Sequence, residues 1–94
     1  MEFDWDAGNT GKNLRHGVSD AEIEEAFTDR RAVLAAKLMV GREVRYTLLG
    51  RARRSGKYLR IVFTVRMKGR RRLIRPISAV EMSDRNKRRY RRRK

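Results

Sequence analysis

A period-two alternation of apolar side chains constrains the fold of this chain more than any other feature of its sequence. It is strictest over residues 59–65, where the apolar positions are Leu59, Ile61, Phe63 and Val65. Successive side chains of a strand point to opposite faces, so this spacing predicts a strand with one buried face. A second alternation over residues 44–48 and apolar stretches over residues 32–40 and 73–80 predict further strands. Pro76 favours an irregular or an edge position for the last of them.

Helix signals lie on either side of the predicted strands. Ser19, followed three residues later by Glu22, has the spacing of a capping box, in which each side chain satisfies a free backbone amide at the start of a helix. The apolar positions that follow are spaced by three and four residues: Ile23, Ala26 and Phe27. A shorter helix is predicted over residues 10–15, and a last one over residues 84–90.

The order of these elements predicts an α+β fold. A short strand over residues 3–6 comes first, followed by two helices, three or four strands and a final helix. We expect a small antiparallel sheet with the helices packed on one face, in a single domain over residues 1–90 with a basic tail over residues 91–94. The open face of the sheet is expected to display Arg45, Thr47, Arg60, Thr64 and Arg66.

Electric charge is distributed unevenly along the chain. The formal net charge is +15, but residues 1–29 carry −6 and residues 30–94 carry +21. A field of this size attracts nucleic acid or an acidic protein from a distance, and it costs the folded state stability through self-repulsion. We therefore expect a polyanionic partner, in preference to a surface that is basic only for solubility.

Several classes of function are excluded by what the sequence lacks. It has no cysteine, which rules out disulfides, thiolate-bound zinc and a cysteine nucleophile. With one histidine, with carboxylates that cluster at a helix start and with no phosphate-binding glycine loop, we expect no metal site and no cofactor. No apolar run reaches the roughly 20 residues of a membrane span, and the acidic N-terminus lacks the features of a signal peptide. We therefore expect a cytoplasmic protein that does not bind membranes.

Several segments resemble the BrnT family of bacterial toxins. At the N-terminal end these are Phe-Asp-Trp-Asp at residues 3–6 and Lys-Asn-Leu-Arg-His-Gly-Val-Ser at residues 12–19. Further similar segments follow in the family's order: residues 24–27, 45–50, 59–64, 74–79 and 88–90. The resemblance thus spans residues 3–90. One position departs from it, because the arginine that usually follows Ser-Ala in the family is Val80 here.

The resemblance implies a RelE-like fold and a type II toxin–antitoxin role, in which the protein cleaves RNA and inhibits translation. The implied partners are RNA and a BrnA-like antitoxin, and a heterotetramer is one assembly that this pairing allows. The antitoxin would bind the DNA of the operon, so this chain would meet DNA only through it. If the missing arginine helps catalysis, Val80 implies that activity is lost or that other residues carry it.

Arginines on the predicted open face are suited to such a reaction. Metal-independent cleavage uses the 2′-hydroxyl of the RNA as nucleophile, and the protein must stabilise a dianionic phosphorane, a task for which the charged, planar guanidinium is well shaped. We predict catalytic roles for Arg45 and Arg66 and RNA binding by Arg60 and Thr64, the alternative being a solvated strand face. Tyr90 is a further RNA-binding candidate that either donates a proton, stacks a base or packs against the sheet.

Three residues outside this face are also candidates. His16, the sole histidine, either moves a proton in catalysis or complements the dipole at a helix C-terminus. Lys12, one turn earlier, either binds RNA phosphate or is merely solvated. Arg75 either lines the catalytic site or pairs with a carboxylate such as Asp4 or Asp6.

The basic face by itself leaves two classes of function open. One is a ribonuclease toxin held by an antitoxin. The other is a non-catalytic nucleic-acid-binding protein, ribosomal or regulatory, in which charge alone provides the affinity. Val80 adds an intermediate case, an inactivated toxin that still binds RNA or its antitoxin.

Overall fold

The computed structural model describes residues 1–92, which contain a five-stranded sheet. Four strands form an antiparallel meander: β2 (Val33–Val40), β3 (Glu43–Arg51), β4 (Tyr58–Lys68) and β5 (Arg71–Glu81). The short β1 (Glu2–Phe3) runs parallel to β5, so the order across the sheet is β1-β5-β4-β3-β2. The strands predicted between residues 32 and 80 and the α+β class are confirmed. Two expectations are corrected: the first strand covers Glu2–Phe3 and not residues 3–6, and the sheet is mixed and not purely antiparallel.

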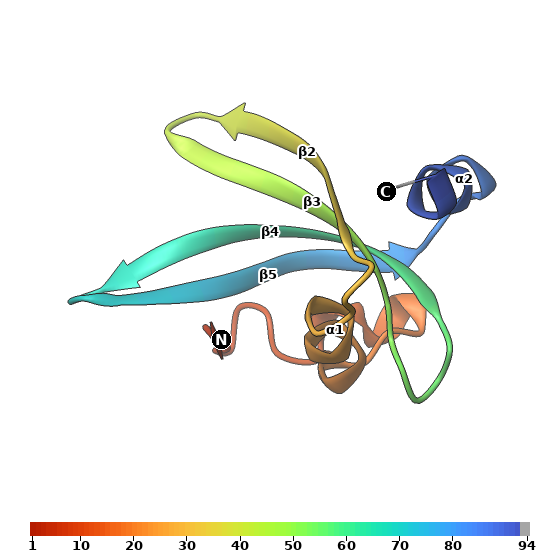
Figure 1. Ribbon diagram of the computed structural model, residues 1–94. Coiled ribbons are helices and arrows are strands. Elements are labelled where there is room, and N and C mark those ends of the chain that lie inside the picture. Colours follow the sequence, from red (N-terminus) through yellow and green to blue (C-terminus); the bar gives the residue numbers. More distant parts are fainter. Residues whose placement is uncertain (93–94) are drawn as a thin grey trace.

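The sheet is strongly twisted, and its two hairpins diverge toward their turns (Figure 1). Buried side chains gather in the half of the sheet where the strands stay together and the helices cover them. Leu59 and Ile61 of β4 are fully buried, whereas Val65, further along the same face, is 37% exposed. The apolar face predicted over residues 59–65 is therefore buried only as far as Phe63.

The helix α1 (Asp20–Phe27) covers this buried face. Ser19 Oγ accepts a hydrogen bond from the Glu22 amide at 3.1 Å, and the Glu22 carboxylate accepts one from the Ser19 amide at 2.9 Å, so the predicted capping box is confirmed. α1 lies very close to β3, where a Cβ atom on Gly50 would meet the carbonyl oxygen of Ala26 at 2.6 Å. Glycine at residue 50 is what lets the helix approach the strand.

A 3-10 helix takes the place of the α-helix predicted over residues 10–15. This element, η1 (Lys12–His16), begins without a side-chain cap and ends at Gly17. The backbone of Gly17 is left-handed, with φ of 74°, which glycine adopts without steric cost. The next residue, Val18, can therefore turn into the core, where it is fully buried.

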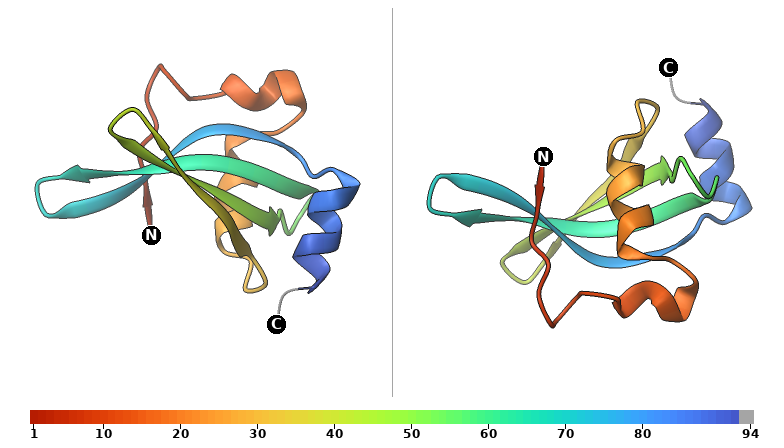
Figure 2. Two further views of the ribbon diagram at one scale, coloured as in Figure 1. Left: turned by 90° about the horizontal axis from the view of Figure 1, so that it is seen from above. Right: turned by 90° about the horizontal axis from the view of Figure 1, so that it is seen from below.

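The helix α2 (Asp84–Arg92) packs on the face of the sheet opposite α1 (Figures 1 and 2), which corrects the expectation that the helices share one face. Leu48 and Leu49 are adjacent on β3, so their side chains point to opposite faces. Leu48 joins the core under α1, whereas Leu49 packs with Met82 and Tyr90. A small second core thus lies under α2.

The predicted start of α2 is confirmed, because Ser83 Oγ accepts a hydrogen bond from the Asn86 amide at 3.1 Å. The helix continues to Arg92, two residues into the segment predicted as a tail, and residues 93–94 of that segment lie outside the described residues. Within residues 1–92, no helix is long and apolar enough to cross a membrane.

Candidate nucleic-acid interface

Strand register places the predicted arginines on one face of the sheet. Leu49 of β3 pairs with Arg60 of β4, and Thr47 pairs with Val62. Directly paired residues of antiparallel strands point to the same side, so odd-numbered residues of β3 share a face with even-numbered residues of β4. This is the face on which α2 packs. We call three of the arginines with this parity the basic face: Arg45, Arg60 and Arg66. Arg60 lies where β3 and β4 pair, whereas Arg45 and Arg66 lie further out, one on each of the two diverging hairpins (Figure 1).

The guanidinium of Arg45 makes few polar contacts within the protein. Its Nε lies 3.6 Å from Glu43 Oε1. The Arg45 Nε atom is shielded from solvent, yet it has no hydrogen-bond partner among the described residues. A half-exposed ion pair at that distance is weak, and a shielded donor without an acceptor costs free energy. An anion that bound at Arg45 would supply the missing acceptor.

Thr64 lies on the same side of β4, and the structure gives its hydroxyl a structural role. Its hydroxyl donates a hydrogen bond to the carbonyl oxygen of Val44 at 2.7 Å, and the residue is only 4% exposed. The one polar group of this side chain is therefore covered and already engaged. Thr64 thus links β3 to β4, and RNA binding by this residue stays a prediction.

Arg75 is held by two carboxylates of the N-terminal segment. Its Nη1 lies 3.0 Å from Asp6 Oδ2 and 3.4 Å from Asp4 Oδ2, and Lys68 Nζ lies 3.0 Å from the other oxygen of Asp4. Of the two alternatives for Arg75, the structure thus shows pairing with carboxylates. The cluster joins the start of the chain to the β4–β5 hairpin.

These ion pairs lower the pKa of both carboxyl groups. The hydrogen bond from Lys68 is the main cause of the low pKa of Asp4, and together with nearby positive charges it outweighs the burial that would raise this pKa. The hydrogen bond from Arg75 is the main cause for Asp6, and the charge of Arg66 contributes. Both groups are therefore ionised and occupied at neutral pH.

Side chains of the N-terminal segment close the outer edge of β5 beyond the end of β1. Asn9 Nδ2 donates a hydrogen bond to the carbonyl oxygen of Pro76 at 3.1 Å. Asn13 Oδ1 accepts one from the Ala79 amide at 3.0 Å, and His16 Nδ1 lies 3.2 Å from the Ala79 carbonyl oxygen. A carbonyl oxygen only accepts, so the last contact requires a proton on Nδ1. These contacts satisfy backbone groups that no neighbouring strand reaches.

His16 and Lys12 therefore lie apart from the basic face. Both belong to η1, which sits beyond the edge strand β5 (Figure 2), so β5 separates them from the arginines of β4. The contact of His16 with Ala79 supports a structural role, and Lys12 is exposed to solvent. The structure does not bring His16 together with Arg45 and Arg66 in one catalytic centre.

Tyr90, predicted to bind RNA, is 6% exposed. Its ring packs edge-on against Tyr58 with the centroids 5.6 Å apart, and its hydroxyl donates a hydrogen bond to Asp29 Oδ2 at 2.6 Å. The structure thus shows packing against the sheet, one of the three alternatives for Tyr90, and RNA binding by this residue stays a prediction.

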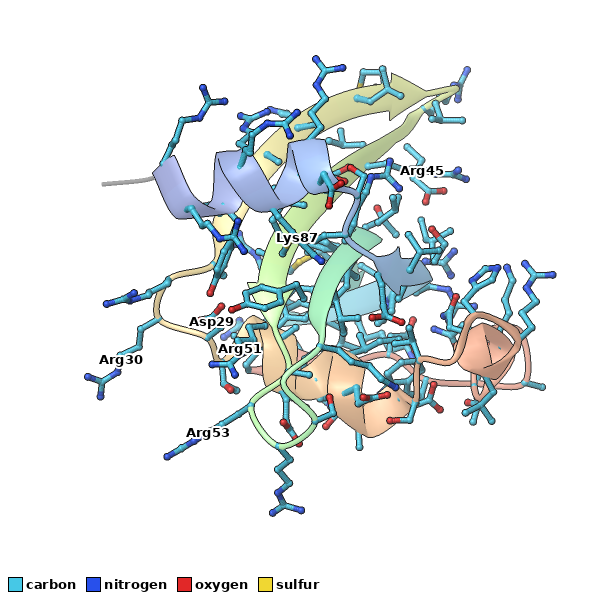
Figure 3. The ribbon with its side chains drawn as sticks, turned by 90° about the vertical axis from the view of Figure 1, so that its right-hand side faces the viewer. Asp29, Arg30, Arg45, Arg51, Arg53 and Lys87 are labelled. Atoms are coloured by element: carbon cyan, nitrogen blue, oxygen red, sulfur yellow. The ribbon has the colours of Figure 1, made fainter. Side chains whose placement is uncertain are left out.

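Lys87 is a cation that the sequence did not single out. It is half-buried and lies between α2 and the sheet (Figure 3). Residues three apart on a helix share a side, so Lys87 and Tyr90 both belong to the inner side of α2. This spacing is the signal that would have identified Lys87, once Tyr90 was known to face the sheet.

The comparison with known families bears on the classes of function that the sequence left open. The family model of the ribonuclease toxin BrnT of type II toxin–antitoxin systems matches residues 5–86. The chain belongs to the BrnT family. BrnT proteins are ribonuclease toxins, so RNA is the substrate and an antitoxin protein the partner that membership implies. No curated protein matches the chain significantly.

The position at which this chain departs from the BrnT resemblance lies on the basic face. Val80 of β5 pairs directly with Arg60 of β4, so their side chains point to the same side of the sheet. An arginine at residue 80 would therefore add a fourth guanidinium to this surface. The departure concerns the interface itself and not a distant part of the fold.

Proposed function

We propose that this BrnT protein is an endoribonuclease that inhibits translation by cleaving RNA on the basic face. The observation that carries the proposal is the grouping of Arg45, Arg60 and Arg66 on one face, in a member of a family of ribonuclease toxins. A surface with several positive charges attracts an anion that lowers their mutual repulsion. The RNA backbone supplies such an anion.

The reaction we propose needs only the protein, the RNA and solvent water. The 2′-oxygen of the RNA forms a bond to the adjacent phosphorus while the bond from phosphorus to the 5′-oxygen breaks. Water takes up the proton of the 2′-hydroxyl and returns one to the leaving 5′-oxygen, so the products are a 2′,3′-cyclic phosphate and a 5′-hydroxyl. Arg45 and Arg66 would stabilise the negative charge of the phosphorane, and Arg60 would hold a neighbouring phosphate.

The donor groups of the site support cleavage without a metal ion. Magnesium prefers carboxylate oxygens, but Asp4 and Asp6 are already bound by Arg75 and Lys68. No group of three or more His, Asp or Glu residues within residues 1–92 is placed to hold a metal ion. The basic face instead presents guanidinium groups, which do the charge-stabilising part of the work directly.

The partner we propose is an acidic, BrnA-like antitoxin that neutralises the toxin in the cytoplasm. The net charge of +21 over residues 30–94 supports an acidic partner, because the field of the toxin would draw such a protein toward the RNA site. Covering the basic face would exclude RNA. A heterotetramer, with DNA bound only by the antitoxin, is the assembly we propose.

Val80 supports a second candidate function. Val80 stands beside Arg60, where the resemblance leads us to expect an arginine. In this second proposal the chain is a toxin that no longer cleaves RNA but still binds RNA or its antitoxin. This reading keeps the basic face and removes only the cleavage step.

The experiment that separates the two is cleavage of RNA by purified protein in excess chelator, followed by analysis of the product ends. The first proposal expects cleavage and 2′,3′-cyclic phosphate termini. Cleavage that stops with chelator, or products with a 5′-phosphate, would contradict the mechanism. No cleavage with or without ribosomes, together with retained RNA binding, would favour the second candidate.

A further inference from the structure

A second basic site lies at the start of β4, the end of the strand that is far from the β4–β5 turn. A cavity of about 370 Å³ opens where the loop after α1, the β3–β4 connection and α2 meet. Its walls consist of Asp29, Arg31, Arg51, Tyr58, Tyr90 and Arg91. We call it the α2 pocket. Sequence analysis assigned a role only to Tyr90 among these residues.

Asp29 holds the frame of the α2 pocket together. Its Oδ1 accepts a hydrogen bond from the Arg31 amide, and its Oδ2 accepts one from the Arg51 amide, both at 2.9 Å. The hydroxyl of Tyr90 donates to Oδ2 at 2.6 Å. One carboxylate therefore ties three segments of the chain together, and its two oxygens are already engaged.

The described lining of the pocket contains three arginines and one carboxylate. The guanidinium of Arg51 lies over the Tyr58 ring, 5.4 Å from its centroid, and its Nε donates a hydrogen bond to the carbonyl oxygen of Gly56 at 3.4 Å. Figure 3 shows Arg51 beside Asp29. Arg31 and Arg91 are exposed, and within residues 1–92 no ion pair joins any of the three arginines to a carboxylate. The lining thus carries an excess of positive charge, in guanidinium groups that suit a phosphate ligand.

The α2 pocket is continuous with the basic face. Tyr58 and Arg60 are two residues apart on β4 and share a side of the sheet. Arg91 follows Lys87 by one helical turn. The helix α2 therefore carries one cation at the pocket, Arg91, and another against the sheet, Lys87. Six residues of β4 separate Tyr58 from Thr64, a distance on the order of 20 Å at about 3.3 Å per residue, which an extended RNA strand of a few nucleotides can cover.

We propose that the α2 pocket binds a phosphate group of the RNA, outside the nucleotide that is cleaved. The proposal rests on the proposed function in that it takes RNA as the ligand. Arg31 and Arg91 hold the phosphate oxygens. Arg51, supported by the Tyr58 ring, presents a planar surface on which a base can stack. The pocket thereby fixes how the strand lies along β4.

The test compares arginines of equal charge inside and outside the pocket. The probe is a 2′-O-methyl RNA hexamer, which binds but cannot be cleaved because its nucleophile is blocked. We expect Arg31→Gln and Arg91→Gln each to weaken its affinity about tenfold. The controls are Arg30→Gln and Arg53→Gln, whose side chains point away into solvent (Figure 3). These controls should weaken binding less than about twofold, with thermal unfolding unchanged in all four variants.

The outcomes separate the site from a diffuse field and from a protein ligand. Equal losses in the four variants would show that only net charge matters and would overturn the proposal. Selective loss of binding to poly-L-glutamate, with RNA binding unaffected, would assign the pocket to an acidic protein and overturn it as well. A hexamer with a 5′-phosphate and one without it distinguish a terminal phosphate from an internal one, and selectivity with either supports the site. Because the probe is not cleaved, an inactive toxin would still show the expected pattern.

Discussion

Arg60 on β4 and Val80 on β5 are direct cross-strand partners, with both side chains on the basic face. A valine beside this arginine leaves the pair without electrostatic repulsion. The same pairing makes residue 80 the position at which one substitution adds a cation to the RNA surface without changing the course of the backbone.

We predict that Val80→Arg strengthens RNA cleavage and slightly weakens the fold. A new guanidinium beside Arg60 should add a charge-assisted contact of about 1.5–3 kcal/mol to the transition state, or roughly ten- to a hundredfold in single-turnover rate. Repulsion from Arg60 should cost about 0.2–1 kcal/mol of unfolding free energy. Val80→Gln is the uncharged control. An unchanged cleavage rate in Val80→Arg would show that the missing arginine is not what limits the enzyme.

We predict that Arg45→Ala and Arg66→Ala each impair cleavage and leave the fold intact. Each variant should lose about 1.5–3 kcal/mol of transition-state stabilisation, which is roughly ten- to a hundredfold in rate. Neither arginine carries a strong ion pair in the protein, so the thermal midpoint should stay the same. Arg53→Ala removes the same charge far from the face and serves as the control. Rates that fall equally in all three variants would exclude a catalytic role for the pair.

Association with the antitoxin should slow as the salt concentration rises. The field of residues 30–94 steers an acidic protein toward the toxin, and salt screens that field over about 10 Å at 0.1 M. Stopped-flow association rates across a range of ionic strengths provide the measurement. The prediction fails if the rate is indifferent to salt, or if the antitoxin binds the acidic helix α1.

Removal of residues 91–94 should weaken RNA binding without slowing the chemical step. The segment carries four positive charges, and its two described residues, Arg91 and Arg92, belong to the end of α2. The dependence of affinity on salt should therefore become shallower, while the single-turnover rate at saturating RNA stays nearly constant. A large loss of that rate would place part of the chemistry on the C-terminal segment.

The stability of the fold should fall in acid through Glu22. Burial raises the pKa of this carboxyl group, but hydrogen bonds from the Ser19 amide, Ser55 and Lys57 outweigh it and lower the pKa from 4.5 to about 2. A group whose pKa is lower in the folded state stabilises that state above its unfolded pKa. The contribution, up to about 3 kcal/mol, is therefore present above pH 4.5 and lost between pH 4.5 and pH 2.

Chemical unfolding of Glu22→Gln at several pH values tests this prediction. The variant should be less stable than the parent protein at neutral pH, and the difference should shrink as the pH falls toward 2. Glu24→Gln, two residues further along α1, provides the matched control, because Glu24 is exposed and glutamine keeps an oxygen that can accept the hydrogen bond from Trp5 Nε1. A constant difference across the whole range would assign the effect to helix capping by the side chain and not to its charge.

Short-range patterns in the sequence were sufficient to predict the four long strands and the capping box. They also predicted the common side-chain direction of Arg45, Arg60 and Arg66. Each of these depends on the direction of side chains within a few residues, which the period of a strand or the first turn of a helix fixes locally. The resemblance to BrnT, carried by segments in the right order, was likewise sufficient for the family. The same local rules placed Thr64 on the open face of the sheet, but they could not show that its hydroxyl donates a hydrogen bond to the carbonyl oxygen of Val44.

Only the tertiary structure decided which of these residues are available to RNA. Arg75 meets Asp4 across 71 residues of chain, and Tyr90 meets Asp29 across 61. Such contacts depend on strand order and on the face that α2 occupies, and no periodicity encodes either. Leu49 packs with Met82 and Tyr90, which holds α2 on the side of the sheet where the basic face lies. Lys87 and the α2 pocket therefore lie on the same side as the arginines. The sequence determined the charges and their spacing along each strand; the packing of distant segments decided which charges are paired and which remain free for a phosphate.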